Sequence, residues 1–134
     1  MHVQAIDIKS KNINDMIQKV QKGLPVRSFE KLGKKLGVSD TLLSRILNIP
    51  MRTLTRRKHQ GRLNAEESEK VLRIAKLYDK ALDVFEDEGA TKKWLKEPAR
   101  GLGGDIPLEY ARTELGAREV EKLLSRIEYG VFPG

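Results

Sequence analysis

Residues 48–62 read NIPMRTLTRRKHQGR, a helix-breaking tripeptide followed by a short run rich in arginine. No acidic residue lies between Asp40 and Glu66, and the same interval holds five arginines and one lysine. The proline of the tripeptide interrupts a preceding helix but is compatible with the start of the next one. The stretch therefore predicts an apolar helix that ends near Leu47, a turn, and a strongly basic helix that begins near Met51.

Helical periodicity extends outward from this stretch over most of the chain, and strand patterns are almost absent. A capping box formed by Asn64 and Glu67 opens the longest expected helix, and Gly89 is its expected stop. The pattern V-x-A-I-x-I, from Val3 to Ile8, indicates either one weak strand or a disordered lead-in. The other expected helices cover about 12–23, 26–36, 39–47 and 51–59, a turn around Trp94, a short segment from Pro107, and a last segment capped by Thr113.

These elements predict an all-α fold of about six to eight helices. We divide it into an N-terminal helical domain with a helix-turn-helix over residues 12–78 and a small helical domain over residues 79–134. The helical spacing predicts an inward face made of Ile13, Met16, Ile17, Val20, Phe29, Leu32, Leu36, Met51, Leu54, Leu115, Val120, Leu123, Leu124 and Ile127.

The bulk composition favours an anionic partner. The chain has 134 residues, a net charge of +7 and a pI near 9.7, which suit nucleic acid, an anionic membrane or an acidic protein surface. It contains no cysteine, so disulfides and thiolate chemistry are excluded and a reducing cytoplasm is expected. No apolar run is long enough for a membrane span, and the opening MHVQAIDIKSKN is too polar for a signal peptide.

The basic helix has the properties of a helix that reads DNA. Two helices joined by a short turn form a helix-turn-helix, and the second lies in the DNA major groove. Met51 and Leu54 are expected to face the core. Two rows then point outward, because pairs four residues apart share a face: Arg52 with Arg56, and Thr53 with Arg57. The cations that follow these rows are expected to contact DNA phosphates. The predicted DNA-binding residues are therefore Arg52, Thr53, Thr55, Arg56, Arg57, Lys58 and Arg62.

Two alternatives compete with this interpretation. A basic run is often only a solvated helix face, but this run is free of acid and follows an apolar helix and a turn. An earlier register is also open, in which the helices over 26–36 and 40–47 form the helix-turn-helix. That register places Ser39, Thr41, Ser44 and Arg45 outward and offers much less positive charge, so we favour the later one.

Other chemistries find little support. The only histidines are His2 and His59, and His59 lies among cations, so no metal site is expected. The glycine-rich segment 101–104 lacks the lysine of a phosphate loop and is expected to be a turn. Without a nucleophile–base pair or a cofactor loop, we expect neither enzymatic activity nor a cofactor. Tyr129 and Phe132, beside Gly130, form an aromatic tail that is a candidate protein contact.

The C-terminal stretch resembles the toxin-binding domain of the Xre/MbcA/ParS family of antitoxins. The resemblance rests on an ordered series of residues: Trp94-Leu95, Pro98, Leu102-Gly103-Gly104, Pro107-Leu108, Thr113-Glu114, Gly116-Ala117, Val120, Leu124 and Arg126-Ile127-Glu128-Tyr129-Gly130. Family members usually carry His where this chain has Tyr129. The upstream stretch, PMRTLTRRKHQGRLNAEESEKVLRIAKL, resembles the Xre-like helix-turn-helix of antitoxins that are paired with RES-domain toxins.

The resemblance implies a type II antitoxin that blocks a RES-domain toxin, represses its own operon by binding double-stranded operator DNA, and forms a homodimer. The NAD⁺-degrading activity of such toxins would belong to the partner. The resemblance also implies that the C-terminal part of the chain covers the toxin, and the predicted toxin-binding residues are Arg126, Glu128, Tyr129, Gly130 and Phe132. The resemblance also implies a bacterial cytoplasmic protein, and no membrane and no small-molecule substrate are expected. The alternatives are a stand-alone helix-turn-helix regulator and a nucleic-acid-binding accessory protein without a toxin.

Gly116 falls in the first turn of the last expected helix, where glycine destabilises the helix relative to alanine. Either this residue is a tolerated accident, or the missing side chain lets another helix or loop approach.

Overall fold

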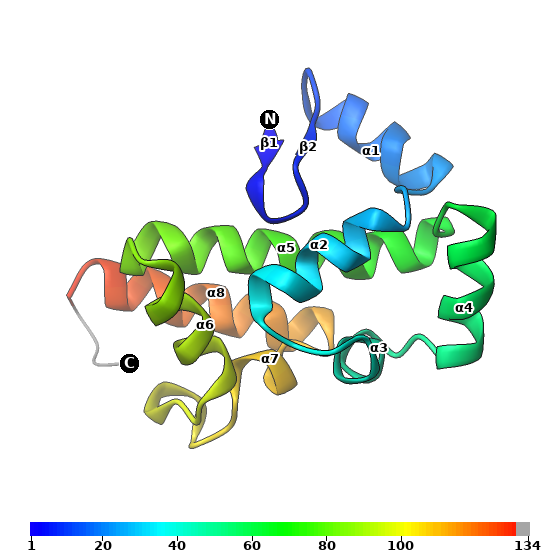
Figure 1. Cartoon of the computed structure of the whole chain (residues 1–134). Coiled ribbons are helices and arrows are strands. Elements are labelled where there is room, and N and C mark those ends of the chain that lie inside the picture. Colours follow the sequence, from blue (N-terminus) through cyan, green and yellow to red (C-terminus); the bar gives the residue numbers. More distant parts are fainter. Residues whose placement is uncertain (131–134) are drawn as a thin grey trace. The chain divides into compact units, whose positions relative to one another are not determined.

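The computed structural model describes residues 1–130, and its main elements are helical (Figure 1). A two-stranded antiparallel sheet, β1 (His2–Val3) and β2 (Ile8–Lys9), precedes the helices. The described residues form eight α-helices: α1 (Ile13–Lys22), α2 (Arg27–Leu36), α3 (Asp40–Leu47), α4 (Met51–Gln60), α5 (Ala65–Phe85), α6 (Glu88–Lys96), α7 (Pro107–Tyr110) and α8 (Glu114–Glu128). The prediction of an all-α fold is confirmed.

The chain divides into two compact units, and α5 runs from one into the other. The first unit covers Met1–Ala75 and the second begins at Lys76. The domain limits expected from the sequence, 12–78 and 79–134, stay a prediction.

In the first unit, the N-terminal residues are part of the core. Val3, Ala5 and Ile6 are almost completely buried, and the short 3₁₀-helix Gln4–Ile6 between the two strands lies against α2. Burial of these three apolar side chains stabilises the hairpin, which two-residue strands alone could not do. The disordered alternative is therefore wrong, and in place of one weak strand the segment forms two short strands joined by a 3₁₀-helix.

Helix starts follow the local signals in the sequence. Asn12 and Ser39 cap α1 and α3 by accepting hydrogen bonds from the backbone N–H groups of Asp15 and Leu42, at 2.9 and 3.1 Å. The capping box at α5 is confirmed in both directions, because Asn64 Oδ1 accepts from Glu67 N at 2.8 Å and Glu67 Oε1 accepts from Asn64 N at 2.9 Å. These bonds satisfy N–H groups that the first helical turn leaves without partners.

In the second unit, the glycine of α8 accommodates a close backbone approach. A Cβ atom on Gly116 would lie 1.7 Å from the carbonyl oxygen of Tyr110, at the end of α7. Thr113 caps α8 by accepting a hydrogen bond from Gly116 N at 3.0 Å, as predicted. Gly116 is therefore required by the packing of α7 on α8, and the accident interpretation is wrong.

The break after α5 differs from the prediction. Gly89 lies inside α6, and the chain turns earlier, at Glu86, whose φ of 54° is left-handed. Asp87 then caps α6 by accepting a hydrogen bond from Ala90 N at 2.7 Å, so the aspartate signal prevails over the glycine. Trp94 on α6 packs on Phe85, with their ring centroids 5.5 Å apart.

Four apolar residues expected in the core are exposed instead: Ile13 and Ile17 on α1, Met51 on α4 and Leu115 on α8, which are 58%, 46%, 42% and 76% exposed. The apolar stripe of α1 is wider than the surface that covers it, and only its Met16–Val20 edge is buried. Met51 and Leu115 lie in the first turns of their helices, where fewer neighbours surround a side chain than in mid-helix.

Candidate functional site

Helix α4 presents a single polar face to solvent. Arg52, Thr55, Arg56 and His59 are all exposed, and their spacing of three and four residues puts them in one row along the helix. Leu54, which is 1% exposed, anchors the opposite face in the core. The side chains of Arg52 and Arg56 form no hydrogen bond or ion pair with another described residue. Arg52, Thr55 and Arg56 of this row belong to the predicted DNA-binding set, and their side chains are available to a partner.

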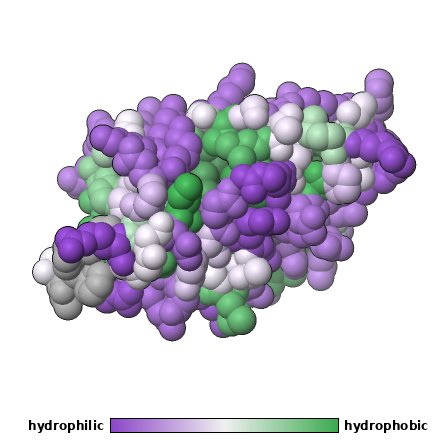
Figure 2. All heavy atoms as spheres, turned by 90° about the horizontal axis from the view of Figure 1, so that it is seen from below, coloured by the Kyte–Doolittle hydropathy of each residue, from purple (hydrophilic) through white to green (hydrophobic). Residues whose placement is uncertain are grey.

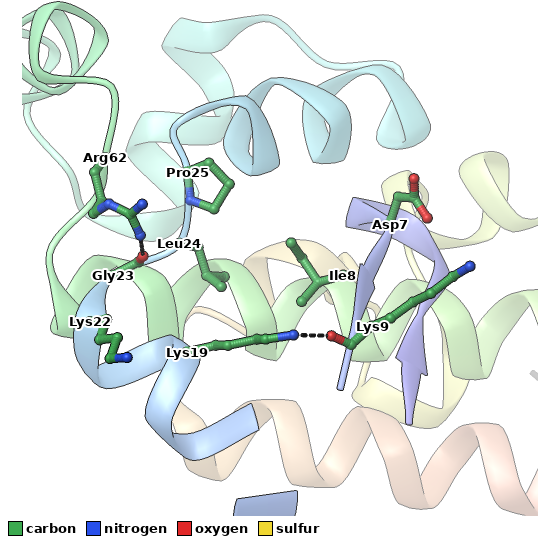
Figure 3. A pocket seen from close by; sticks show the side chains of 9 residues that line it. All are labelled: Asp7, Ile8, Lys9, Lys19, Lys22, Gly23, Leu24, Pro25 and Arg62. Carbon is green, nitrogen blue, oxygen red and sulfur yellow. Dashed lines mark hydrogen bonds between the residues drawn. The ribbon is translucent and has the colours of Figure 1, made fainter. Parts of the chain in front are cut away.

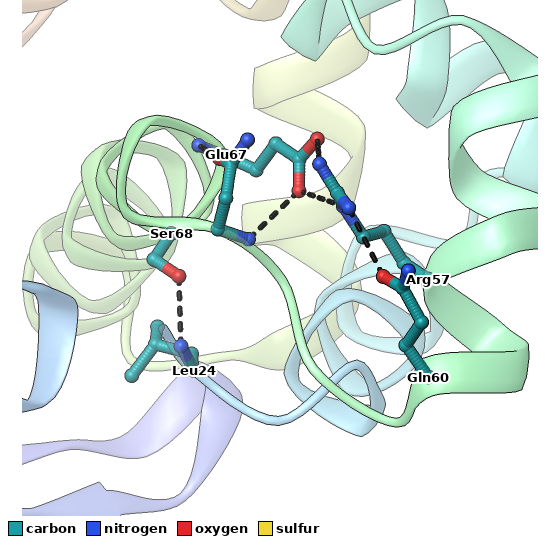
Figure 4. Close-up of polar contacts among 6 residues, drawn as sticks. Leu24, Arg57, Gln60, Glu67 and Ser68 are labelled. Carbon is teal, nitrogen blue, oxygen red and sulfur yellow. Dashed lines mark hydrogen bonds and ion pairs between the residues drawn. The ribbon is translucent and has the colours of Figure 1, made fainter. Parts of the chain in front are cut away.

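Arg57 belongs to an internal network (Figure 4). Its Nε and Nη2 donate to Oε1 and Oε2 of Glu67 at 2.8 and 3.1 Å, and its Nη1 donates to Gln60 Oε1 at 3.0 Å. The Arg57 side chain is only 15% exposed. The second outward arginine row expected from the sequence is therefore wrong, because Arg57 turns toward the start of α5 and Thr53 is half-buried.

The contact between Arg57 and Glu67 favours the charged form of both side chains. Burial alone would raise the pKa of Glu67, but the hydrogen bonds from Arg57 and from the Asn64 N–H outweigh it and the pKa is lowered. The hydrogen bond to Glu67 in turn raises the pKa of Arg57. One carboxylate thus caps α5 and also holds the end of α4 in place.

The two trailing cations also have intramolecular partners. Lys58 Nζ lies 2.7 Å from Asp40 Oδ2 at the start of α3, and this contact raises the pKa of Lys58. Arg62 donates from Nη1 to the carbonyl oxygen of Gly23 at 2.6 Å. Both side chains keep donors that face solvent, so a contact with phosphate stays a prediction for each.

Both helix-turn-helix registers have suitable turns. Three residues separate α2 from α3 and also α3 from α4, and each turn begins with a left-handed residue, Gly37 or Asn48. In the earlier register Thr41 and Arg45 are exposed, whereas Ser44 is 2% exposed and faces inward. A cavity of about 340 Å³ at the α2–α3 turn is lined by two acidic residues, Glu30 and Asp40, and one basic residue, Lys34, so its charge is less suited to phosphate than that of α4.

Within the second unit, the predicted toxin contacts lie around the end of α8. Tyr129 is 76% exposed, Arg126 is exposed, and Glu128 forms an ion pair with Lys80 at 3.5 Å. Gly130 follows in a left-handed turn, with φ of 67°. Phe132 lies outside the described residues.

Two exposed apolar residues of this unit were missed as possible contacts. Leu115, which we assigned to the core, is mostly exposed, and Tyr110 is partly exposed. Their backbones are adjacent, because the carbonyl of Tyr110 lies against Gly116. The sequence offered one sign that Leu115 is exposed, which is its position in the first turn of the helix, between Glu114 and Gly116.

Charge is divided unequally between the two units. Residues 1–75 contain 16 Lys and Arg against 7 Asp and Glu, a net charge of +9, and residues 76–134 contain 10 against 12, a net charge of −2. On the face drawn in Figure 2, hydrophilic side chains predominate and hydrophobic ones appear in separate small areas. None of the helices in residues 1–130 is both long and apolar enough to cross a membrane.

Comparison with known proteins assigns both units. The antitoxin Xre-like helix-turn-helix domain matches residues 15–76, and the antitoxin Xre/MbcA/ParS C-terminal toxin-binding domain matches residues 80–130. Antitoxin Xre of Yersinia enterocolitica is 35% identical over 119 residues, which cover 87% of this chain and 80% of the relative. The chain belongs to the Xre antitoxin family.

Two further antitoxins extend this comparison. Antitoxin Xre of Photorhabdus laumondii is 36% identical over 116 residues, which cover 84% of this chain and 77% of the relative. The Prs ADP-ribosylating antitoxin of Sphingobium sp. is 28% identical over 128 residues, which cover 88% of this chain and 80% of the relative. The resemblance noted in the sequence is confirmed at the level of the Xre-like helix-turn-helix and the toxin-binding domain.

Proposed function

We propose that this Xre-family chain neutralises a RES-domain toxin by direct binding and represses its own operon by binding operator DNA, as a homodimer. The observation that carries the proposal is the division of charge: +9 on the unit that matches a helix-turn-helix, −2 on the unit that matches a toxin-binding domain. Positive charge supplies affinity for phosphates, whereas a near-neutral surface suits a protein partner.

For DNA, we propose that the exposed row of α4 reads base edges. Arg52 and Arg56 are one helical turn apart, are exposed and have no competing hydrogen-bond partner among the described residues. An arginine that bonds guanine in two places contributes about 1–3 kcal/mol of discrimination. Arg57 takes an indirect role in this scheme, because its network fixes the end of α4. A contact between Arg57 and DNA would require the bond to Glu67 to open.

The packing of α2 on α3 supports the earlier register as the second candidate. A Cβ atom on Gly33 of α2 would lie 3.7 Å from Leu43 Cδ2 of α3, which is ordinary van der Waals contact. Such a compact helix pair is a general feature of helix-turn-helix units. In this register α3 would enter the major groove and present Thr41 and Arg45.

Gel shifts with the operator and a scrambled duplex separate the two registers. If α4 reads DNA, Arg52→Ala and Arg56→Ala each weaken operator binding by about 1–3 kcal/mol and relax specificity, while Thr41→Ala and Arg45→Ala have small effects. Lys93→Ala, which removes a charge from the second unit, is the matched control and leaves binding unchanged. The reverse ranking would move the recognition helix to α3.

For the toxin, we propose that the end of α8 and the tail beyond it form the contact, through Arg126, Glu128, Tyr129, Gly130 and Phe132. The exposure of Tyr129 supports this proposal, since large aromatic side chains carry much of the energy of protein interfaces. Glu128 already pairs with Lys80, so its effect is expected on association rate more than on affinity.

Co-purification with the adjacent gene product tests the toxin role. An antitoxin retains one toxin chain stoichiometrically, and a stand-alone regulator retains none. Tyr129→Ala should weaken capture and protection of cells while the melting temperature stays the same. A loss of stability with capture intact would show that Tyr129 supports the fold instead.

The dimer is proposed from DNA geometry. One recognition helix covers only a few base pairs, and two helices about one DNA turn apart are the usual solution. Sedimentation should therefore give a dimer at micromolar concentration. A monomer that binds a single half-site would contradict this part of the proposal.

A further inference from the structure

The first unit contains a cavity that the proposed function does not use (Figure 3). It has a volume of about 270 Å³ and lies between β2, the end of α1 and the segment that joins α1 to α2. Its walls are Asp7, Ile8, Lys9, Lys19, Lys22, Gly23, Leu24, Pro25 and Arg62. We propose that this cavity binds a small organic phosphate monoester, with the organic part on an apolar floor and the phosphate at a cationic rim.

The floor consists of the partly exposed Ile8 and Pro25 and of the buried Leu24 behind them, and the backbone of Leu24 is held in place. The Leu24 N–H donates to Ser68 Oγ at 2.7 Å, and the Leu24 carbonyl accepts from Leu63 N at 2.9 Å. Gly23 adds a tight wall, because a Cβ atom there would lie 2.0 Å from the Leu63 carbonyl oxygen. A site with fixed walls loses little entropy on binding.

The rim is cationic and partly unpaired. Within residues 1–130 no acceptor contacts the ammonium of Lys22. Arg62 uses one N–H for the Gly23 carbonyl and keeps its other donors. Lys19 donates to the carbonyl oxygen of Lys9. The one carboxylate in the lining, Asp7, is already paired with His2 at 3.1 Å and with Lys31 at 3.6 Å.

These features together define the ligand class. A phosphate monoester carries close to two negative charges at neutral pH and several strong acceptor oxygens, which match an arginine and neighbouring lysines. The apolar floor adds affinity only for a ligand with an organic body. Cavities for drug-sized ligands span roughly 300–1,000 Å³, so this one suits a molecule no larger than a mononucleotide.

Contact with a DNA backbone is the competing explanation for the same cations. A DNA phosphate would use Lys22 and Arg62 but would leave the floor of Ile8, Leu24 and Pro25 without a role. The floor therefore favours the small ligand. The two explanations predict different effects of Lys22→Ala on the binding of a small ligand and of DNA.

Calorimetric titration of the full chain with AMP tests the proposal, with adenosine and inorganic phosphate as comparison ligands. AMP should bind at least about tenfold more tightly than either, because only AMP engages both floor and rim. Lys22→Ala should weaken AMP binding severalfold at an unchanged melting temperature, since this side chain has no partner to lose. Lys93→Ala removes the same charge outside the cavity and should leave AMP binding intact.

Three results would overturn the proposal: no binding of AMP, equal binding of inorganic phosphate and AMP, or a Lys22→Ala variant that binds AMP normally. A Lys22→Ala variant with weaker DNA binding and no AMP effect would assign the rim to the DNA backbone. Ile8→Ser, read against its own melting temperature, tests the floor separately and should weaken AMP while leaving inorganic phosphate unaffected.

Discussion

At the scale of single residues, Arg57 connects two helices through a two-point bond to Glu67. We expect Arg57→Ala to lower the free energy of unfolding by about 1.5–3 kcal/mol, because it removes charged hydrogen bonds in a mostly buried place. Lys58→Ala is the matched comparison, since its pair with Asp40 is about 40% exposed and should contribute at most about 1 kcal/mol. Urea unfolding of both variants measures the difference, and equal losses would remove the special role of Arg57.

Glu67 makes part of the stability dependent on pH. Its pKa is lowered in the folded state, so its contribution is complete above the ordinary glutamate pKa of about 4.3 and is lost as the pH falls through the lower folded value. Glu67→Gln removes this titration. We expect the variant to be less stable than the wild type at pH 7 and to approach it near pH 3. A constant difference in melting temperature across that range would exclude this linkage.

Gly116 and Gly33 both lie in helices, and we expect alanine to have opposite effects at the two positions. At Gly116 the new Cβ would overlap the Tyr110 carbonyl, so Gly116→Ala should destabilise the second unit by more than about 2 kcal/mol. At Gly33 the nearest atom is Val38 O at 3.5 Å, and helix propensity should stabilise Gly33→Ala by up to about 1 kcal/mol. Thermal unfolding of the two variants checks the signs.

At the scale of elements, α1 shows that an apolar stripe and a buried face are different things. We expect Met16→Ala to cost about 2–4 kcal/mol, because Met16 is 1% exposed, whereas Ile17→Gln should change stability by less than about 0.5 kcal/mol. Urea unfolding distinguishes the two. A large loss in Ile17→Gln would mean that this side of α1 is covered in solution.

Local signals predicted the helices well because the physics of a helix end is local. Asn12, Ser39 and Thr113 each bond an N–H three residues ahead, and that spacing can be read from the sequence alone. The break at Glu86 was missed because Asp87 starts a new helix as its N-cap, and this signal prevails over Gly89 as the end of α5.

The candidate site was less predictable, because its orientation depends on contacts far apart in sequence. In the sequence Arg57 is one more basic residue of the run, and only the fold shows that it bonds Glu67, ten positions later. Arg62 likewise bonds the carbonyl oxygen of Gly23, 39 positions earlier. The residues of α4 alone predict a basic helix, whereas the tertiary contacts decide which of its side chains face solvent. The cavity at Lys22 has no local signature at all.

At the scale of the whole molecule, the unequal charges predict where salt acts. The logarithm of the DNA affinity should fall with the logarithm of the salt concentration, with a slope of about −0.9 for each neutralised phosphate. Replacing Lys58 of the first unit by alanine should flatten the slope by about 0.9, because Lys58 is predicted to neutralise one phosphate. Replacing Lys92 and Lys93 of the second unit should leave it unchanged. A flatter slope in the Lys92/Lys93 variant would mean that the second unit also binds DNA.

Trp94 gives the molecule an optical consequence. It is the only tryptophan of the chain, it lies in the second unit, and its ring packs on Phe85. Excitation at the red edge of protein absorption therefore yields emission from that unit alone, because the tyrosines contribute little there. A wavelength shift that appears when the toxin is added, but not when operator DNA is added, would report occupancy of one binding partner without any label.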